Sequence, residues 1–246
     1  MKRITLLATA DVHSPRYLMA FITKLRELPG KPDLIIWAGD MVEKNNINAL
    51  EPVLKYTREK FPETPIVSIF GNEEYRGYEE HYISRYRDII WVNDSYVIHE
   101  VGDTRIGIIG TRGSLDKLTS WQARNMPWLQ KYYRQLPQKI LDLAKKLRRQ
   151  CDIIILVSHY GVTYRNLKGE HPSAWPYLAS KHMETIIKPD IVDIVIHGHA
   201  HKAIIEKITI NNVPVYNVSF PAFNKIFMIV LEARKKGLLY WLGMSQ

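Results

Sequence analysis

The chain has 246 residues, 46% of them hydrophobic, which is enough for a continuous core, and we expect residues 1–246 to form one domain. Lysine and arginine outnumber aspartate and glutamate by 34 to 25, and the net charge of +9 favours anionic partners. The single cysteine, Cys151, excludes a disulfide framework or a cysteine-type zinc site within one chain. No apolar segment is long enough to cross a membrane, so we expect a cytoplasmic protein with no membrane partner.

The first third of the chain alternates between apolar runs and segments with apolar residues at helical spacing. The predicted strands are residues 4–10, 33–38 and 65–70. One predicted helix begins at Ser14-Pro15, and a second spans residues 47–61. Each of the three strands ends in polar residues. Ligands in open α/β sheets bind outside the carboxyl ends of the strands, so these polar ends are expected to converge.

Shorter elements are predicted in the middle of the chain. Aromatic residues at helical spacing predict a short helix over 75–86 that packs on the sheet. Residues 89–92, 96–101 and 105–109 predict an antiparallel meander. A long basic helix is predicted over 127–150, kinked or restarted at Pro137. Its lysines and arginines are interpreted as a solvated face rather than a nucleic-acid site.

In the last third, two buried strands each run into histidines. The apolar residues 153–157 lead to His159, and residues 190–196 lead to His197-Gly198-His199-Ala200-His201, where Gly198 is expected to let the backbone turn. Between them, residues 162–179 form a long irregular loop near the same rim. Two hairpins are expected to follow, formed by residues 203–210 with 213–218 and by residues 227–231 with 238–241.

Seven candidate ligands stand at the ends of five predicted strands. They are Asp11, His13, Asp40, Asn72, His159, His199 and His201. Any one of them is more simply a helix cap, a turn residue or a satisfied polar group, but independent capping seldom produces such an ending on five strands. Imidazole mixed with oxygen ligands suits manganese, iron, zinc or nickel better than calcium or magnesium alone.

The order and spacing of these residues resemble the calcineurin-like metallophosphoesterases. The matching blocks are Asp11-Val12-His13, Gly39-Asp40-Met41-Val42-Glu43, Gly71-Asn72-Glu73-Glu74, His159 and Gly198-His199-Ala200-His201. The resemblance implies an α/β fold, a sandwich of two β-sheets flanked by helices. It also implies two divalent ions, with manganese favoured. Asp40 would bridge them, Asp11, His13 and His201 would hold one, and Asn72, His159 and His199 would hold the other.

One position departs from the family pattern, because Glu73 stands where a histidine that assists the leaving group is expected. Glu73 is a candidate catalytic residue, but a carboxylate beside two cations is a poor proton donor. We therefore favour a phosphodiesterase that uses a metal-bridging hydroxide on a small phosphoester or nucleotide-like substrate. The alternatives are a phosphomonoesterase, a nuclease acting on nucleic acid, or a scaffold without catalysis. Arg16 and Arg112 follow strand ends and either bind phosphate or take surface and helix-start roles.

Overall fold

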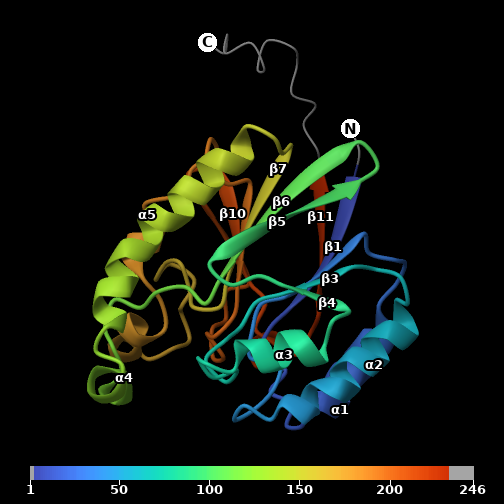
Figure 1. The fold of residues 1–246 in the computed structure, drawn as a ribbon, viewed down its shortest axis with the longest axis horizontal. Coiled ribbons are helices and arrows are strands. Elements are labelled where there is room, and N and C mark those ends of the chain that lie inside the picture. Colours follow the sequence, from blue (N-terminus) through green and yellow to red (C-terminus); the bar gives the residue numbers. More distant parts are fainter. Residues whose placement is uncertain (1–2, 233–246) are drawn as a thin grey trace.

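Two mixed β-sheets pack against each other between layers of helices in the computed structural model, which describes residues 3–232 (Figure 1). The first sheet has the strand order β11-β1-β2-β3-β4, with β11 antiparallel to β1 and the other pairs parallel. Its strands are β1 (Arg3–Thr9), β2 (Leu34–Trp37), β3 (Ile66–Ser68), β4 (Ile89–Trp91) and β11 (Phe227–Glu232). The expected sandwich of two sheets is confirmed.

The second sheet has the order β5-β6-β7-β8-β10-β9, with β6, β7, β8 and β10 parallel and both edge strands antiparallel to their neighbours. Its strands are β5 (Ser95–Val101), β6 (Thr104–Thr111), β7 (Ile153–Ser158), β8 (Ile194–His197), β9 (Lys207–Ile210) and β10 (Val213–Asn217). The expected hairpin before residue 218 is therefore present as β9 and β10.

Helices cover the outer face of each sheet. The elements on the first sheet are α1 (Leu18–Glu27), η1 (Ile47–Ala49), α2 (Leu50–Lys60) and α3 (Glu79–Arg85). The remaining ones are α4 (Ser120–Asn125), α5 (Leu129–Arg148), the 3-10 helix η2 (Pro172–Tyr177), α6 (Lys181–Glu184) and α7 (Phe220–Phe223), of which α5 and α6 pack on the second sheet. None of the helices in residues 3–232 is long and apolar enough to cross a membrane.

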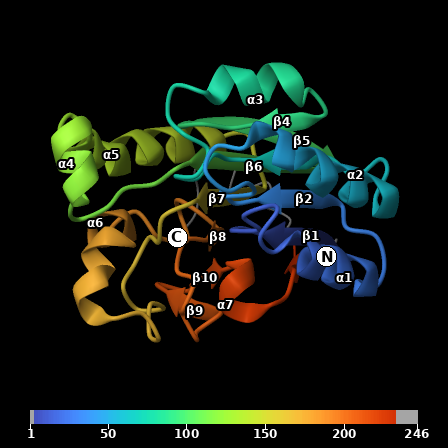
Figure 2. The same cartoon turned by 90° about the horizontal axis from the view of Figure 1, so that it is seen from below.

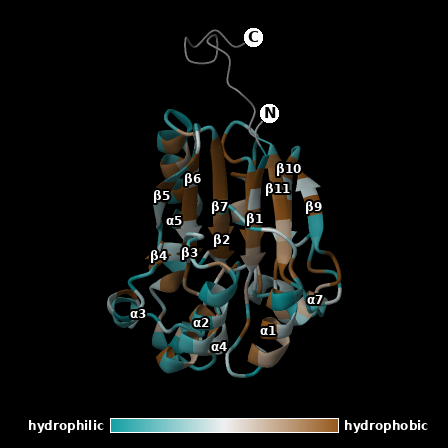
Figure 3. Cartoon of the chain, turned by 90° about the vertical axis from the view of Figure 1, so that its right-hand side faces the viewer, coloured by the Kyte–Doolittle hydropathy of each residue, from teal (hydrophilic) through white to brown (hydrophobic). Residues whose placement is uncertain are grey.

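The core between the sheets is built from alternate residues of the parallel strands. Leu6 and Ile36 face the second sheet, while Leu7 and Ile35 face the helices. Every residue of β2, β7 and β8 is buried, as expected for parallel strands that are covered on both faces. The hydropathy colouring shows the same layering, with brown strands between helices that carry teal surfaces (Figure 3).

The expected three-stranded meander is wrong in its first member. β4 joins the first sheet, where Ile66 of β3 pairs in parallel with Ile89, while only β5 and β6 form an antiparallel hairpin, in the second sheet. The connection through α3 is long enough for a parallel crossover, so β4 extends the sheet begun by β1 to β3. β11 pairs with β1 at the edge of the first sheet, and the hairpin partner predicted at 238–241 lies outside the described residues.

Two helix predictions also need correction. The first helix begins at Leu18 and not at Ser14-Pro15, because His13 and Ser14 donate backbone hydrogen bonds to the loop after β2. The long helix α5 is continuous through Pro137, so it does not restart there. Pro137 lies on the buried face with Leu136 and Ile140, and this packing holds the helix together despite the missing backbone donor.

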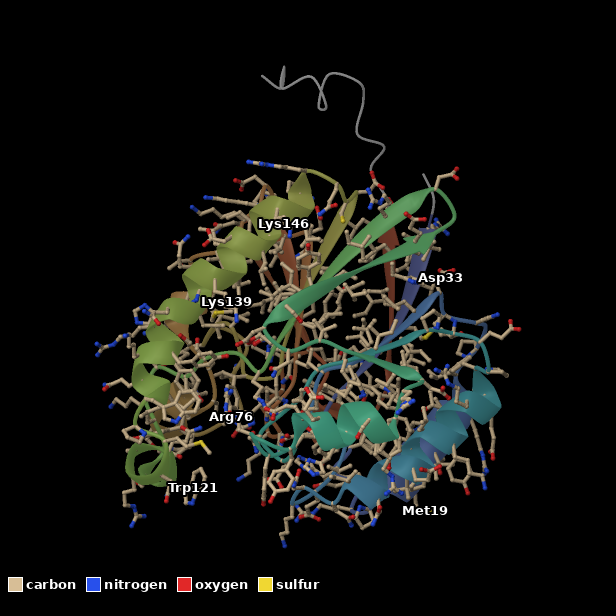
Figure 4. The ribbon with its side chains drawn as sticks, in the orientation of Figure 1. Met19, Asp33, Arg76, Trp121, Lys139 and Lys146 are labelled. Atoms are coloured by element: carbon tan, nitrogen blue, oxygen red, sulfur yellow. The ribbon has the colours of Figure 1, made fainter. Side chains whose placement is uncertain are left out.

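The basic face of α5 is occupied by contacts within the chain. Lys146 lies over the Tyr96 ring at 5.2 Å, and Arg148 donates to Asp193 at 2.8 Å. Figure 4 shows Lys139 and Lys146 along α5, at a distance from the α4 end that Trp121 marks. Two of the cations at the carboxyl end of α5 therefore have partners within the chain.

Candidate metal centre

Six of the candidate ligands gather in two groups at the carboxyl edge of the parallel strands, the edge that Figure 2 views from below, and Asn72 joins them through His159. Four of the seven come from the first sheet and three from the second. Asp11 and His13 follow β1, Asp40 follows β2, Asn72 follows β3, His159 follows β7, and His199 and His201 follow β8. The site therefore lies at the seam between the sheets, where the loops of both can meet.

One group of potential ligands consists of Asp11, His13, Asp40 and His201, each offering an atom within 4.8 Å of the others. His201 Nε2 lies 3.3 Å from Asp11 Oδ1, and His13 Nε2 lies 3.9 Å from Asp40 Oδ2. The Nε2 atoms of His13 and His201 are 3.4 Å apart. These four residues are the bridging residue and the first ligand set that the family resemblance implied.

Asp40 also belongs to the second group, with His159 and His199. His159 Nδ1 contacts the Ala38 carbonyl oxygen at 2.9 Å, which turns Nε2 towards Asp40 Oδ2 at 3.3 Å and Asn72 Oδ1 at 3.1 Å. When Nδ1 donates to that carbonyl, Nε2 has a lone pair and faces two oxygen acceptors. A cation between the three atoms would satisfy all of them.

Each carboxylate is held by a backbone amide through one oxygen and leaves the other free for a cation. His199 N donates to Asp11 Oδ2 at 2.9 Å, and Glu73 N donates to Asp40 Oδ1 at 2.7 Å. Among the described residues, Asp11 Oδ1 and Asp40 Oδ2 are buried without a partner of good hydrogen-bond geometry, and each lies 3.3 Å from an imidazole Nε2. Buried anionic oxygens need a compensating charge, so this donor set fits divalent ions.

Positive φ angles occur at four of the seven candidate ligands: Asp11 (60°), His13 (43°), Asp40 (52°) and His199 (68°). Residues other than glycine adopt this region rarely, and strained backbone of this kind clusters at functional sites. The turn attributed to Gly198 is thus made by His199. Gly198 is needed for space instead, since a Cβ there would lie 2.5 Å from Ala10 Cβ and 2.8 Å from Asp11 Oδ2.

The pKa values of the histidines differ because their charged neighbours differ. Burial alone raises the pKa of Asp11 and Asp40, but the nearby histidines, chiefly His201 and His159 respectively, outweigh it and lower both pKa values. Burial lowers the pKa of His159, yet the Asp40 carboxylate reverses this and raises it to about 9. For His199, burial and the charge of His159 lower the pKa to about 3. Carboxylates in this site are ionised and ready for cations.

Glu74 is a supporting residue to which the sequence pattern assigned no role. Its carboxylate accepts hydrogen bonds from Asp40 N at 2.8 Å, Gly71 N at 2.7 Å and Val42 N at 3.2 Å. Burial and the Asp40 charge raise its pKa to about 7. Glu74 thereby joins the loops after β2 and β3, and its place in the Gly71-Asn72-Glu73-Glu74 block was the available signal.

Glu73, the candidate catalytic residue, lies at the edge of the second group. Its Oε2 accepts a hydrogen bond from Lys44 N at 2.6 Å, and its Oε1 lies 3.4 Å from Asn72 Nδ2. The carboxylate is therefore engaged as an acceptor on both oxygens. Its backbone amide also orients Asp40, a contribution that does not depend on the side chain.

The arginines after the strand ends have structural partners. Arg112 is 2% exposed, and its guanidinium bonds the Gly71 and Glu74 carbonyl oxygens and Glu79, at 2.8 Å in the last case. Arg16 forms an ion pair with Glu43. Arg112 therefore holds the loop that carries Asn72 and is not free to bind phosphate.

His197 is a buried residue that supports the loop carrying His199 and His201. It is fully buried, and its Nδ1 lies 2.9 Å from the Gly198 carbonyl oxygen while Nε2 lies 2.7 Å from Asn166 Nδ2. Burial lowers its pKa to about 4, so the ring is neutral, with Nδ1 donating and Nε2 accepting. The contact also shows what part of the 162–179 loop does, since Asn166 fixes the base of the histidine loop.

The comparisons with known proteins agree with this geometry. Residues 4–203 match the calcineurin-like phosphoesterase family. The chain belongs to that family. The comparison with curated proteins found no match.

Solved structures of other calcineurin-like folds resemble the chain at low identity. Phosphopantetheinyl hydrolase from Mycobacterium tuberculosis has a TM-score of 0.64 and 14% identity, with 92% of this chain and 96% of that chain covered. A putative 5′-nucleotidase from Staphylococcus aureus has a TM-score of 0.58 and 16% identity, with 94% and 51% covered. NAD nucleotidase from Haemophilus influenzae has a TM-score of 0.57 and 16% identity, with 93% of this chain and 47% of that chain covered. The chain spans about half the length of both nucleotidases, and at these identities the likeness concerns the fold.

Proposed function

We propose that this calcineurin-like phosphoesterase is a phosphodiesterase that requires two divalent ions, with manganese the favoured metal. Asp11, His13 and His201 would hold one ion, Asn72, His159 and His199 would hold the other, and Asp40 would bridge them. The observation that carries the proposal is the pair of buried carboxylate oxygens without a partner of good hydrogen-bond geometry, both turned towards imidazole nitrogens. Two ions in such a site activate water and neutralise phosphoryl charge.

The residues of the chain have separate tasks in this reaction. Asp11 and Asp40 supply the negative charge that retains the ions, and their amide partners fix the direction of the free oxygens. His159 presents Nε2 because Ala38 holds Nδ1. His201, with 38% of its side chain exposed, lies on the solvent side, where a substrate enters.

The preference for diesters rests on Glu73. An alkyl monoester has a poor leaving group and benefits from a proton donor, which a positioned general acid supplies. Both oxygens of Glu73 accept hydrogen bonds or face an amide donor, so the side chain is occupied as an acceptor. Diesters with good leaving groups need less of this assistance, and small nucleotide-like diesters suit the chain's net charge of +9.

The test compares bis(4-nitrophenyl) phosphate with an alkyl monoester, glycerol 2-phosphate, in the presence of Mn²⁺. We expect kcat/KM to be at least about tenfold higher for the diester, since a missing general acid costs 10²–10⁴-fold where the leaving group needs it. Metal analysis of the same sample is expected to give two ions per chain. Dominant monoester turnover would contradict the diester preference, and less than one ion per chain after Mn²⁺ supplementation would favour a scaffold.

A further inference from the structure

A cleft of about 480 Å³ lies near the candidate metal centre and is lined by the first turns of α5, by η2 and by α6. One wall is the loop Leu115–Leu118, which continues from the site edge of β6, and another is formed by Tyr133 and Arg134 of α5. Tyr177 and His182 line the opposite side. The volume is typical of sites for small molecules.

Two aromatic rings connect this cleft to the metal centre. Tyr133 packs edge to face on Tyr160 with ring centroids 6.4 Å apart, and the Tyr160 ring lies 4.8 Å from that of His199. Tyr160, which is 4% exposed, lies between Tyr133 of the cleft wall and His199 of the metal centre. The cleft wall is therefore two ring contacts away from a candidate ligand of the metal centre.

Two cationic side chains of the cleft have no charged or hydrogen-bonding partner among the described residues. Lys117 and Arg134 line it, both are exposed, and within residues 3–232 neither side chain has an ion pair or hydrogen bond. The acid in the lining, Asp116, is already engaged: it accepts from Tyr164 Oη and Ser180 Oγ, both at 2.7 Å. An anionic group is the ligand that such a pair of cations favours.

The lining of the cleft also includes apolar and aromatic side chains. Leu115 and Tyr133 are buried in the wall, while Tyr177 is 38% exposed at the rim. Aromatic rings next to cations favour a planar ring system that carries phosphate, because the ring stacks while the cations pair with the charge.

We infer that the cleft is a subsite for a phosphorylated nucleoside and that the substrate is a phosphodiester with a second, terminal phosphate. This inference rests on the proposed phosphodiesterase function. The scissile phosphate would lie at the metal centre, and the terminal phosphate would pair with Lys117 and Arg134.

Matched dinucleotides test the subsite with the Mn²⁺-loaded full chain. Adenylyl-(3′→5′)-adenosine is compared with the same compound carrying a 5′-phosphate. We expect the phosphate to raise kcat/KM at least tenfold in the wild type, and the double substitution Lys117→Ala/Arg134→Ala to bring the ratio near one while sparing the unphosphorylated substrate. The matched control is Lys131→Ala/Lys145→Ala, which removes two exposed α5 charges outside the cleft and is expected to keep the preference.

Calorimetry with adenosine 5′-monophosphate separates the subsite from the reaction. We expect the Kd to rise at least tenfold in Lys117→Ala/Arg134→Ala and to stay constant in Lys131→Ala/Lys145→Ala. An unchanged Kd in the cleft variant overturns the subsite, whatever the activity. Equal affinity for inorganic phosphate overturns its nucleoside part. If bis(4-nitrophenyl) phosphate is not cleaved, the proposed function fails, whereas the calorimetric result still stands for the cleft.

Discussion

The two halves of the candidate metal centre are fixed in different ways. The first sheet supplies the carboxylates, and Asp11 and Asp40 are 0% and 1% exposed, each with one oxygen held by a backbone amide. The second sheet supplies three imidazoles, which range from the fully buried His159 to His201 with 38% of its side chain exposed. The acidic half is therefore rigid and internal, and the imidazole half opens towards solvent.

The two halves therefore contribute different properties to the site. The first supplies negative charge, and the second supplies access from solvent. Burying two carboxylates beside each other is costly unless cations or protonated imidazoles compensate them. The acidic half thus depends most on the metals and on its amide donors. The exposed end of the imidazole half is the place where a ligand can be exchanged or a substrate can approach.

Removing the shared carboxylate gives the largest expected effect. Asp40→Asn keeps the side-chain volume but deletes the charge that both groups of ligands share. We expect both ions to be lost and kcat/KM to fall by more than roughly 1000-fold, since changes outside the ligand sphere alone cost 10–100-fold. Metal analysis and turnover of bis(4-nitrophenyl) phosphate measure the two effects. Retention of two ions with normal turnover would show that Asp40 does not bridge.

The exposed histidine gives the contrasting case. His201→Asn removes a ligand at the solvent side and leaves Asp11, His13 and Asp40 in place. We expect one ion to be lost at low Mn²⁺ and activity to fall about 100-fold, with partial recovery as the Mn²⁺ concentration rises. A titration of activity against Mn²⁺ distinguishes this from Asp40→Asn, which is not expected to recover. Identical titration curves for both variants would remove the distinction between the halves.

A substitution at Glu74 tests whether the backbone hydrogen bonds that its carboxylate accepts help to hold Asp40 in place. Glu74→Gln replaces one acceptor oxygen with an NH₂ group that would face backbone donors from Asp40, Gly71 or Val42. We expect a 10–100-fold loss of metal affinity and a free energy of unfolding lower by about 1–3 kcal/mol. Equilibrium Mn²⁺ binding and urea unfolding measure these. Glu80→Gln, at an exposed glutamate of α3, is the control, and we expect it to spare metal affinity.

How much the sequence predicts depends on whether a residue acts through its own chemistry or through a distant contact. The candidate ligands were identified because imidazole, carboxylate and amide groups recur at the ends of apolar runs, and the two-sheet fold was expected from the resemblance that these groups carry. The roles of Glu74 and Arg112 were not, because their partners lie in other loops and give no local pattern. For the same reason β4 was misassigned: its length and apolarity fit either sheet, and only the crossover through α3 decides between them.

Backbone conformation marks a second limit. Gly198 is the residue that a sequence-based argument selects for the turn, since glycine tolerates positive φ. The structure instead places His199 at a φ of 68°, where its amide can reach Asp11 Oδ2, and keeps position 198 small for contact with Ala10. Such strain arises from the assembled site, so it was not visible along the chain.

The smallest expected effect concerns the reaction's substrate range. Glu73→His restores the residue type of the family pattern beside Asn72 and places a group that can donate a proton at the edge of the acidic half. We expect turnover of an alkyl monoester such as glycerol 2-phosphate to rise about tenfold, a part of the 10²–10⁴-fold that a well-positioned acid supplies, while the aryl diester changes little. Steady-state kinetics on both substrates measure the ratio.

The matched control for this substitution is Glu73→Gln, which keeps an acceptor for Lys44 N but offers no acid of suitable pKa. If Glu73→His and Glu73→Gln raise monoester turnover equally, the gain comes from lost negative charge near an anionic substrate and not from proton donation. If neither changes the ratio, Glu73 lies outside the chemistry and the diester preference must originate elsewhere. A gain confined to Glu73→His would instead locate the control of leaving-group chemistry at this single position, next to an otherwise complete set of candidate ligands.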